Sequence, residues 1–337
     1  MGAHCRHLRA GIAALIALAL SGTMAQAQLQ DVTMAMPSVS LSYAMAYIAD
    51  AKGLWEKHGL RVKMVVITGV GATNATIAGS VDFSHGSGAS LTRAVARGQK
   101  LIAIVGVLQR TSIDIVLRKS LTDAAHFDPK APLKERAQLL RGRKIAIAGV
   151  NSIDQVYLNL IAKRGGYDPD LIPIAVMAAD NALAAFSSGQ VDGVAISPPT
   201  PQRLVLDGVA TTIASGFGGD PPDMTPLATT IVITKPETCE KRRAICEGMG
   251  QAMKEAALVL RDHLDEAEAI MVKRLPSVDP KLIAAILPKV REAMPYPPTV
   301  SEKSLENSER ANIEAGLMKP SEKLASYKGL ATDEYVK

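Results

Sequence analysis

Aromatic residues and cysteines are scarce in this sequence. Phenylalanine, tryptophan and tyrosine make up 4% of its 337 residues, and Trp55 is the single tryptophan. Two rings would suffice to stack on a ligand, but a larger aromatic cage is not expected. No histidine pair lies near Cys239 and Cys246 to complete the four ligands of a structural zinc site. We therefore expect neither a metal nor another cofactor.

Blocks of basic residues are absent as well. The 33 acidic residues are interspersed among 38 lysines and arginines, and the formal net charge is +5. Nucleic-acid-binding proteins instead gather basic residues on one face, so we expect no nucleic-acid partner. The small positive balance is compatible with an anionic ligand.

Motifs of common enzymes are missing too. The sequence has no His-Glu-x-x-His metal motif and no Gly-x-Ser-x-Gly nucleophile motif. Gly69 and Gly71 begin a loop that lacks the third glycine of a dinucleotide-binding fingerprint. These absences predict that the protein is not an enzyme.

The first residues predict export. Arg6 and Arg9 precede an uninterrupted apolar run, Ile12–Leu20, which is too short to span a bilayer. Ala25-Gln26-Ala27 then places small residues at the two positions that signal peptidase reads. We expect residues 1–27 to be a removed signal peptide, with the mature protein in the periplasm. An uncleaved membrane anchor is the alternative.

The two neighbouring cysteines leave a disulfide open. Within one helix, Cys239 and Cys246 would lie ~10.5 Å apart along the axis. That distance exceeds the Cα separation of about 4.4–6.8 Å in disulfides. However, Pro236 and Thr238 indicate a helix that starts near Cys239, which would place this cysteine in the non-helical cap. The sequence does not decide between the bonded and the free state.

Strands and helices alternate along the chain. Clustered or alternating apolar residues predict strands, and apolar residues at helical spacing predict amphipathic helices. The predicted strands are 32–36, 62–66, 81–84, 101–108, 113–118, 144–148, 172–176, 193–196 and 227–234, and the main predicted helices are 44–55, 91–96, 152–164 and 181–188. Beyond Pro236 the chain becomes mostly helical. This order predicts an α/β fold with parallel βαβ units.

A pseudo-repeat links the two halves of the chain. Residues 77–82 and 186–192 each place a glycine at a helix end and Val-Asp at a strand start. We interpret Asp82 and Asp192 as turn and cap residues rather than catalytic ones. The repeat predicts two similar lobes.

Ligand-binding residues are expected at the carboxyl ends of the strands, where doubly wound sheets bind their ligands. Free N–H groups of helix N-termini lie there as well. The loops at these ends are rich in serine, threonine, glycine and asparagine, which suits a small polar or anionic ligand. The candidate ligand-binding residues are Ser38, Ser40, His85, Ser87, Arg110, Asn151, Ser152 and Ser197. Arg110 would balance a negative charge, and His85 would either donate to the ligand or cap its strand.

Two segments resemble a known family. Residues 47–60 read Tyr-Ile-Ala-Asp-Ala-Lys-Gly-Leu-Trp-Glu-Lys-His-Gly-Leu, and residues 184–193 read Ala-Ala-Phe-Ser-Ser-Gly-Gln-Val-Asp-Gly. Both resemble the solute-binding proteins of ABC importers, in the branch that carries nitrate, sulfonates, taurine and thiamine-type pyrimidines. The resemblance implies a two-lobe periplasmic binding protein of type II, with doubly wound mixed sheets and an interlobe ligand cleft.

The resemblance also implies an organisation and partners. Lobe 1 would comprise residues 28–112 and 228–337, and lobe 2 residues 113–227. The protein would be a monomer that binds a sulfonate, taurine, nitrate or carboxylate and delivers it to ABC permease and ATPase subunits.

Three alternatives remain open. The ligand could instead be a thiamine-type pyrimidine precursor, and the same fold could serve a sensory receptor. A pyrimidine-synthase-like enzyme is disfavoured, because those relatives carry a clustered-cysteine motif that the mature chain lacks.

Overall fold

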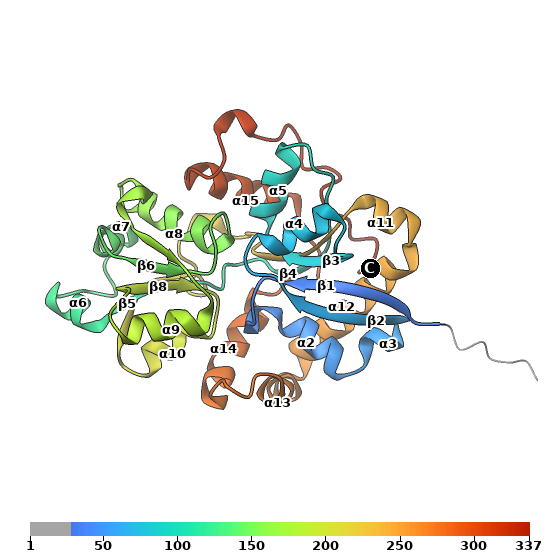
Figure 1. Ribbon diagram of the computed structural model, residues 1–337, viewed down its shortest axis with the longest axis horizontal. Coiled ribbons are helices and arrows are strands. Elements are labelled where there is room, and N and C mark those ends of the chain that lie inside the picture. Colours follow the sequence, from blue (N-terminus) through green and yellow to red (C-terminus); the bar gives the residue numbers. More distant parts are fainter. Residues whose placement is uncertain (1–27) are drawn as a thin grey trace, which may run out of the picture.

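The computed structural model describes residues 28–337. The expected signal peptide, residues 1–27, lies outside the described residues. Among residues 28–337, no helix has the length and apolar character needed to cross a membrane. The chain forms two bodies, each built around one five-stranded sheet, which lie side by side in Figure 1.

The first sheet has the strand order β2-β1-β3-β10-β4. Strand β1 is parallel to β2 and β3, whereas β10 is antiparallel to β3 and β4. Because β10 follows the whole second sheet in the sequence, the chain returns to the first body to complete it. The strands are β1 (Gln30–Met36), β2 (Leu60–Val66), β3 (Phe83–Gly86), β4 (Ile102–Leu108) and β10 (Thr230–Thr234).

The second sheet repeats this arrangement, with the order β7-β6-β8-β5-β9. Strand β6 is parallel to β7 and β8, and β5 is antiparallel to β8 and β9. The α/β fold with mixed, doubly wound sheets is therefore confirmed. The strands are β5 (Asp114–Arg118), β6 (Ile145–Ile147), β7 (Ile174–Val176), β8 (Gly193–Ile196) and β9 (Ala210–Ser215).

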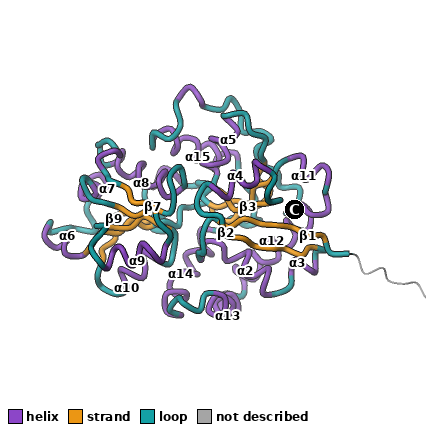
Figure 2. The backbone as a smooth tube through the Cα atoms, in the orientation of Figure 1, coloured by secondary structure: helices purple, strands orange, loops and turns teal. Residues whose placement is uncertain are grey.

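Helices cover both faces of each sheet (Figure 2). The largest apolar core joins the first sheet to α2 and to the C-terminal helices α12, α13 and α14, which return to this body. The helices are α2 (Ala44–Ala51), α3 (Leu54–Lys57), α4 (Gly71–Ala78), α5 (Gly88–Ala96), α6 (Lys119–Ala124), α7 (Leu133–Ala137), α8 (Ile153–Arg164), α9 (Ala179–Ser187), α10 (Thr200–Leu206), α11 (Pro236–Lys241), α12 (Arg243–Asp262), α13 (Leu264–Arg274), α14 (Pro280–Ala293) and α15 (Glu302–Glu314).

The predicted elements are present with shifted ends. The predicted helix 44–55 is divided into α2 and α3, because Gly53 adopts a left-handed conformation with φ of 62°. The predicted helix 91–96 begins earlier, at Gly88, because Ser87 caps its first turn. The predicted helix ends are wrong where the backbone conformation or the capping of a single residue decides where a helix begins or ends.

Cys239 and Cys246 form a disulfide with a Cα–Cα distance of 5.6 Å. Cys239 lies inside the short helix α11, which corrects the expectation that it would lie in a non-helical cap. The chain breaks at Arg242, between α11 and α12, with φ of −132° and ψ of 56°. This break brings the two cysteines closer than a continuous helix would.

Asp82 and Asp192 hold equivalent places in the two bodies. The Thr33 N–H donates to Asp82 Oδ2 at 2.8 Å, and the Lys144 N–H donates to Asp192 Oδ2 at 2.9 Å. Each carboxylate therefore ties the start of one parallel strand, β3 or β8, to the backbone of the neighbouring strand, β1 or β6. Asp82 also accepts a hydrogen bond from Arg242 Nη1 at 2.5 Å. The pseudo-repeat in the sequence thus encodes the same structural contact twice.

We expect Asp82→Ala to destabilise the protein more than Asp192→Ala. Both variants lose a hydrogen bond between neighbouring strands, worth about 0.5–1.5 kcal/mol, but only the first also removes the carboxylate partner of Arg242, which keeps its bond to the Asp31 carbonyl. Urea unfolding should show a loss of about 1–3 kcal/mol for Asp82→Ala and about 1 kcal/mol for Asp192→Ala. Equal losses would show that the Arg242 contact adds nothing.

Candidate ligand-binding cleft

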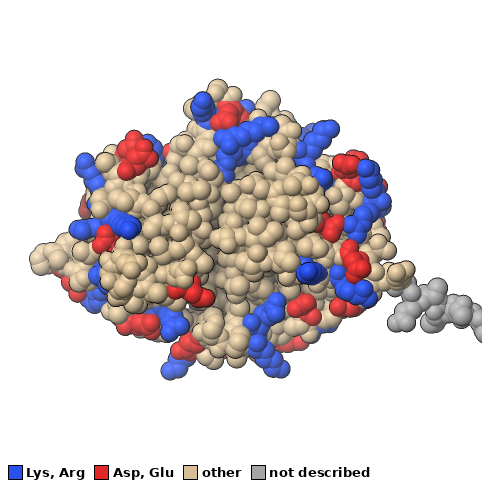
Figure 3. Space-filling view, viewed as in Figure 1, with Lys and Arg blue, Asp and Glu red and all other residues tan. Residues whose placement is uncertain are grey.

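A cleft lies between the two bodies. It contains about 620 Å³ of space not filled by protein atoms, a volume that includes solvent at its open side. Its walls come from loops that follow strands of both sheets and from the two chain crossings near residues 111–113 and 229–230. In Figure 3 the charged side chains lie mostly toward the rim of the face, away from the centre where the bodies meet.

Several sequence-predicted residues line this cleft together. Ser38 follows β1 and Ser87 follows β3, on the side of the first sheet. Asn151 and Ser152 follow β6, and Ser197 follows β8, on the side of the second. The carboxyl ends of parallel strands from both bodies therefore converge on one space.

Two of the predicted residues are buried beside the cleft. The Ser40 hydroxyl donates to the carbonyl of Pro198 at 2.7 Å and does not line the space. The ring of His85 is fully buried and packs against Tyr43, with 4.7 Å between ring centroids. Burial lowers the pKa of His85 to about 3, so this imidazole is neutral at physiological pH. His85 therefore supports the Tyr43 ring from behind.

The expected counter-charge for an anion is not in the cleft. Arg110 lines a separate cavity near the crossing between the bodies, together with Tyr157 and Met224. Its Nη1 donates to the carbonyl of Phe217 at 3.4 Å. The structure thus places the Arg110 guanidinium away from the residues with which the sequence grouped it.

Sequence reasoning missed the other polar residues of the cleft. Thr111 and Ser112 lie at one chain crossing, and the Thr229–Thr230 pair lies at the other. Adjacent hydroxyl residues at both predicted crossings were the signal that could have identified them. The missed polar lining residues are Tyr43, Thr73, Ser90, Thr111, Ser112, Asp154, Thr229 and Thr230.

First-turn residues of α5 and α8 reach the cleft. Ser87 caps α5: its hydroxyl accepts the Ser90 N–H at 3.1 Å, and the Ser90 hydroxyl accepts the Ser87 N–H at 3.0 Å. Ser152 precedes α8, and its hydroxyl donates to the Gly149 carbonyl at 2.6 Å. Positive partial charge at both helix N-termini therefore lies close to any bound molecule.

Asp154 is the carboxylate of the cleft. It lies in the first turn of α8, is 4% exposed, and accepts the Ala148 N–H through Oδ2 at 3.1 Å. Burial raises the pKa of Asp154 from its ordinary value of 3.8 to about 7, and the Ala148 hydrogen bond opposes this shift. Tyr43 approaches from the other body, and burial, with a smaller contribution from Asp154, raises the pKa of its hydroxyl. No lysine, arginine or histidine is among the lining residues in the described part of the chain.

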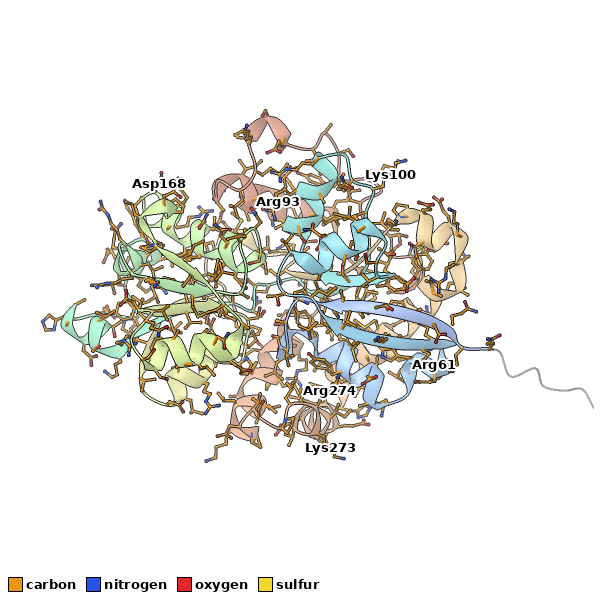
Figure 4. All side chains as sticks on the ribbon, in the orientation of Figure 1. Arg61, Arg93, Lys100, Asp168, Lys273 and Arg274 are labelled. Atoms are coloured by element: carbon orange, nitrogen blue, oxygen red, sulfur yellow. A yellow bond between two sulfur atoms is a disulfide. The ribbon has the colours of Figure 1, made fainter. Side chains whose placement is uncertain are left out.

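The two bodies touch across the cleft. From α5, Arg93 Nη2 donates to the Asn151 carbonyl at 2.5 Å, while Nη1 donates to Asn312 Oδ1 at 2.8 Å. Figure 4 shows Arg93 between α5 and α15, toward the second body. A Cβ placed on Gly149 would lie 3.4 Å from the Cα of Gly69. These contacts describe an arrangement in which the bodies are closed on each other.

A second, outer cavity continues from the cleft toward α9, α10 and the α13–α14 turn. It contains about 1330 Å³ of unfilled space and shares four lining residues with the cleft: Pro37, Ser38, Ala148 and Ser197. Exposed Val39 and Val66 help to line it. The cleft therefore opens outward through a wider space, whose lining also includes Asp180 and Arg203.

Replacing the Asp154 carboxylate should change stability in a pH-dependent way. Because the folded-state pKa of Asp154 is raised, the native protein binds this proton more tightly than the unfolded chain does. Stability from this group is therefore complete below pH 3.8 and is lost as pH rises to about 7. Asp154→Asn keeps an oxygen for the Ala148 N–H but cannot ionise. Urea unfolding of the ligand-free proteins should show the variant about 1–4 kcal/mol more stable above pH 7, and similar in acid. A stability difference that does not vary with pH would contradict the assignment.

The family of the chain follows from its sequence. Residues 41–267 match the family described as NMT1/THI5 like, a range that spans both sheets. A Brucella abortus protein provisionally named a binding protein is 30% identical over 155 residues. That match covers 45% of this chain and 43% of the relative, so the chain spans less than half the length of the curated relatives it matches.

Solved structures share the fold over most of the chain. A Bordetella bronchiseptica protein aligns with a TM-score of 0.75 and 19% identity, covering 91% of this chain and 95% of the other. The alkanesulfonate-binding protein SsuA from Xanthomonas axonopodis pv. citri, solved with bound MOPS, gives 0.67 and 19%, covering 86% and 95%. The periplasmic nitrate-binding protein NrtA from Synechocystis PCC 6803 gives 0.62 and 16%, covering 75% and 69%. At these identities the likeness concerns the fold, which is that of periplasmic binding proteins. Because the family match covers residues 41–267, more than half of the sequence, the chain belongs to the NMT1/THI5-like family.

Proposed function

We propose that the protein is the solute-binding receptor of an ABC importer. It captures a small polar molecule in the periplasm, between lobe 1 (residues 28–112 and 228–337) and lobe 2 (113–227), and delivers it to permease and ATPase subunits. The observation that carries this proposal is the cleft, whose lining side chains come from both bodies. Binding there couples occupancy to closure, because a ligand that contacts both lobes favours the closed form.

The chemistry of the cleft supports binding rather than catalysis. Its polar lining consists mainly of hydroxyl groups, which need an adjacent base to act as nucleophiles. The carboxylate of the lining, Asp154, accepts the Ala148 N–H, and among the described residues no hydrogen bond joins it to a hydroxyl group of the cleft. The nearest histidine described here, His85, is buried behind Tyr43 and lies outside the lining. We propose that the cleft releases its ligand unchanged.

The class of ligand depends on which charged groups line the cleft. The sequence favoured an organic or inorganic anion with Arg110 as counter-charge, but Arg110 lines another cavity. An anion would therefore depend on hydroxyl groups and helix N-termini. A neutral polar ligand, such as a thiamine-type pyrimidine precursor, meets the same hydroxyl groups without needing a counter-charge.

We expect one solute class to stabilise the protein and compact it. Taurine, nitrate, small carboxylates and pyrimidines form the screening panel in thermal unfolding. A true ligand at a hundredfold over its dissociation constant should add about 2.7 kcal/mol. Small-angle scattering should then show a smaller radius for the liganded protein. Stabilisation without compaction would contradict delivery by lobe closure.

A wedge between the lobes should weaken binding of any solute found in that screen. In Gly149→Leu the new side chain would meet Gly69 across the cleft and hold the lobes apart. A steric cost of about 1–3 kcal/mol corresponds to roughly 5- to 150-fold weaker binding in calorimetric titration. Val150→Leu is the matched control, because Val150 lies in the same loop but is exposed. Equal affinity in both variants would show that closure is not required.

A further inference from the structure

Asp154 is an acidic group without a matching base in the cleft. The lining residues contain one carboxylate and, in the part of the chain described, no lysine, arginine or histidine. Buried carboxylates in proteins are normally paired with a cation or satisfied by several hydrogen-bond donors. Asp154 is 4% exposed, and the hydrogen bond recorded for it is the one from the Ala148 N–H to Oδ2.

The arginine that contacts the cleft loop at Asn151 is already engaged. Arg93, on α5, donates to the Asn151 carbonyl and to the Asn312 side chain, and its guanidinium is held between those two groups. A positive partner for the ionised form of Asp154 would therefore enter from the cleft.

The helix N-termini do not turn the cleft into an anion site. At α5 the Gly88 N–H donates to the Ala228 carbonyl at 2.6 Å, and the Ser90 N–H donates to the Ser87 hydroxyl. At α8 the first turn carries Asp154 itself, whose negative charge opposes an incoming anion. An anion would thus be desolvated beside a carboxylate, and Arg110 is not among the residues that line the cleft.

We propose that Asp154 anchors a positively charged nitrogen of the solute, such as an ammonium or amidinium group, through charge-assisted hydrogen bonds. The inference rests on the proposed receptor function. That function does not determine the charge of the ligand, and the inference assigns a positive charge to the ligand group at Asp154. Tyr43 faces Asp154 from the other lobe, so a cation between them contacts both lobes. Hydroxyl oxygens such as those of Ser38 and Ser197 can accept its remaining N–H groups.

Asp154 also has a structural role, which the experiment must separate from ligand binding. Its bond to the Ala148 N–H orders the turn before α8 whether or not a ligand is present. Asp154→Asn retains an acceptor for this N–H and removes only the charge. Asp114→Asn is the matched control, because Asp114 is a buried carboxylate outside the cleft whose oxygens accept from Gln202 and Ser215.

The test uses three probes of nearly one shape and different charge: benzamidinium, benzamide and benzoate. Calorimetric titration of the wild-type protein at neutral pH should rank them in that order. In Asp154→Asn, benzamidinium should bind about 10- to 150-fold more weakly, the range expected for one charge-assisted hydrogen bond. Benzamide affinity should change by less than about threefold. Asp114→Asn should bind all three probes as the wild type does.

Three results would overturn the proposal. One is benzoate binding more tightly than benzamidinium, and another is unchanged benzamidinium affinity in Asp154→Asn. The third is no benzamidinium or acetamidinium binding to the wild type at millimolar concentration. A different result would contradict the receptor function: no solute, whatever its charge, would reduce the radius of the protein in small-angle scattering. An anion that closes the lobes of both the wild type and Asp154→Asn would contradict the proposal of a cationic ligand, but it would support the receptor function.

Discussion

Buried hydroxyl groups gather around the cleft and the chain crossings, and the need to satisfy these groups shapes the structure there. Ser42 Oγ lies 2.8 Å from Ser112 Oγ, the Ser40 hydroxyl donates to Pro198, and Thr229 Oγ1 donates to the Arg110 carbonyl at 2.8 Å. A buried hydroxyl without a partner is costly, so each lies where another polar group can meet it. Hydroxyl groups can exchange these partners for water or ligand when the bodies separate. Another part of the seam between the bodies is apolar: α5, α8 and α15 share a buried cluster that includes Ala89, Val156 and Ala311, and this part would lose its burial free energy on opening.

The repeated topology explains why these polar groups converge. Both sheets order their strands in the same way, with one antiparallel strand, β10 or β5, next to a chain crossing. Asp82 and Asp192 hold equivalent pairs of strands together, at the ends of β3 and β8 remote from the cleft, and the carboxyl ends of β1, β3, β6 and β8 are directed at the cleft. The small residues that follow those ends let the loops approach closely, as Gly69 and Gly149 do.

Much of the fold could be predicted from the sequence, because apolar periodicity and the Val-Asp repeat report local structure. The cleft residues Ser38, Ser87, Asn151, Ser152 and Ser197 could be grouped because strand ends of a doubly wound sheet share one edge. Arg110 could not be placed, since its side-chain direction depends on packing around Phe217. Asp154 was missed because an acidic residue in a helix's first turn is ordinary in sequence. Only burial and the absence of a nearby base in the described cleft set it apart.

Electrostatics within the cleft favours one sign of ligand charge over the other. Helix N-termini attract anions when their N–H groups are free, but the capping box of α5 uses the Ser87 and Ser90 groups internally. At α8 the positive partial charge of the helix N-terminus interacts with Asp154, which is itself a residue of the first turn. Burial strengthens the interaction of this carboxylate with whatever enters, because little water remains to screen it. The Asp154 carboxylate therefore repels a negative group and holds a positive nitrogen. The fold is nevertheless shared with proteins named for sulfonate and nitrate binding. Ligand charge is thus set by a few side chains placed on the common scaffold, and the scaffold itself does not determine it.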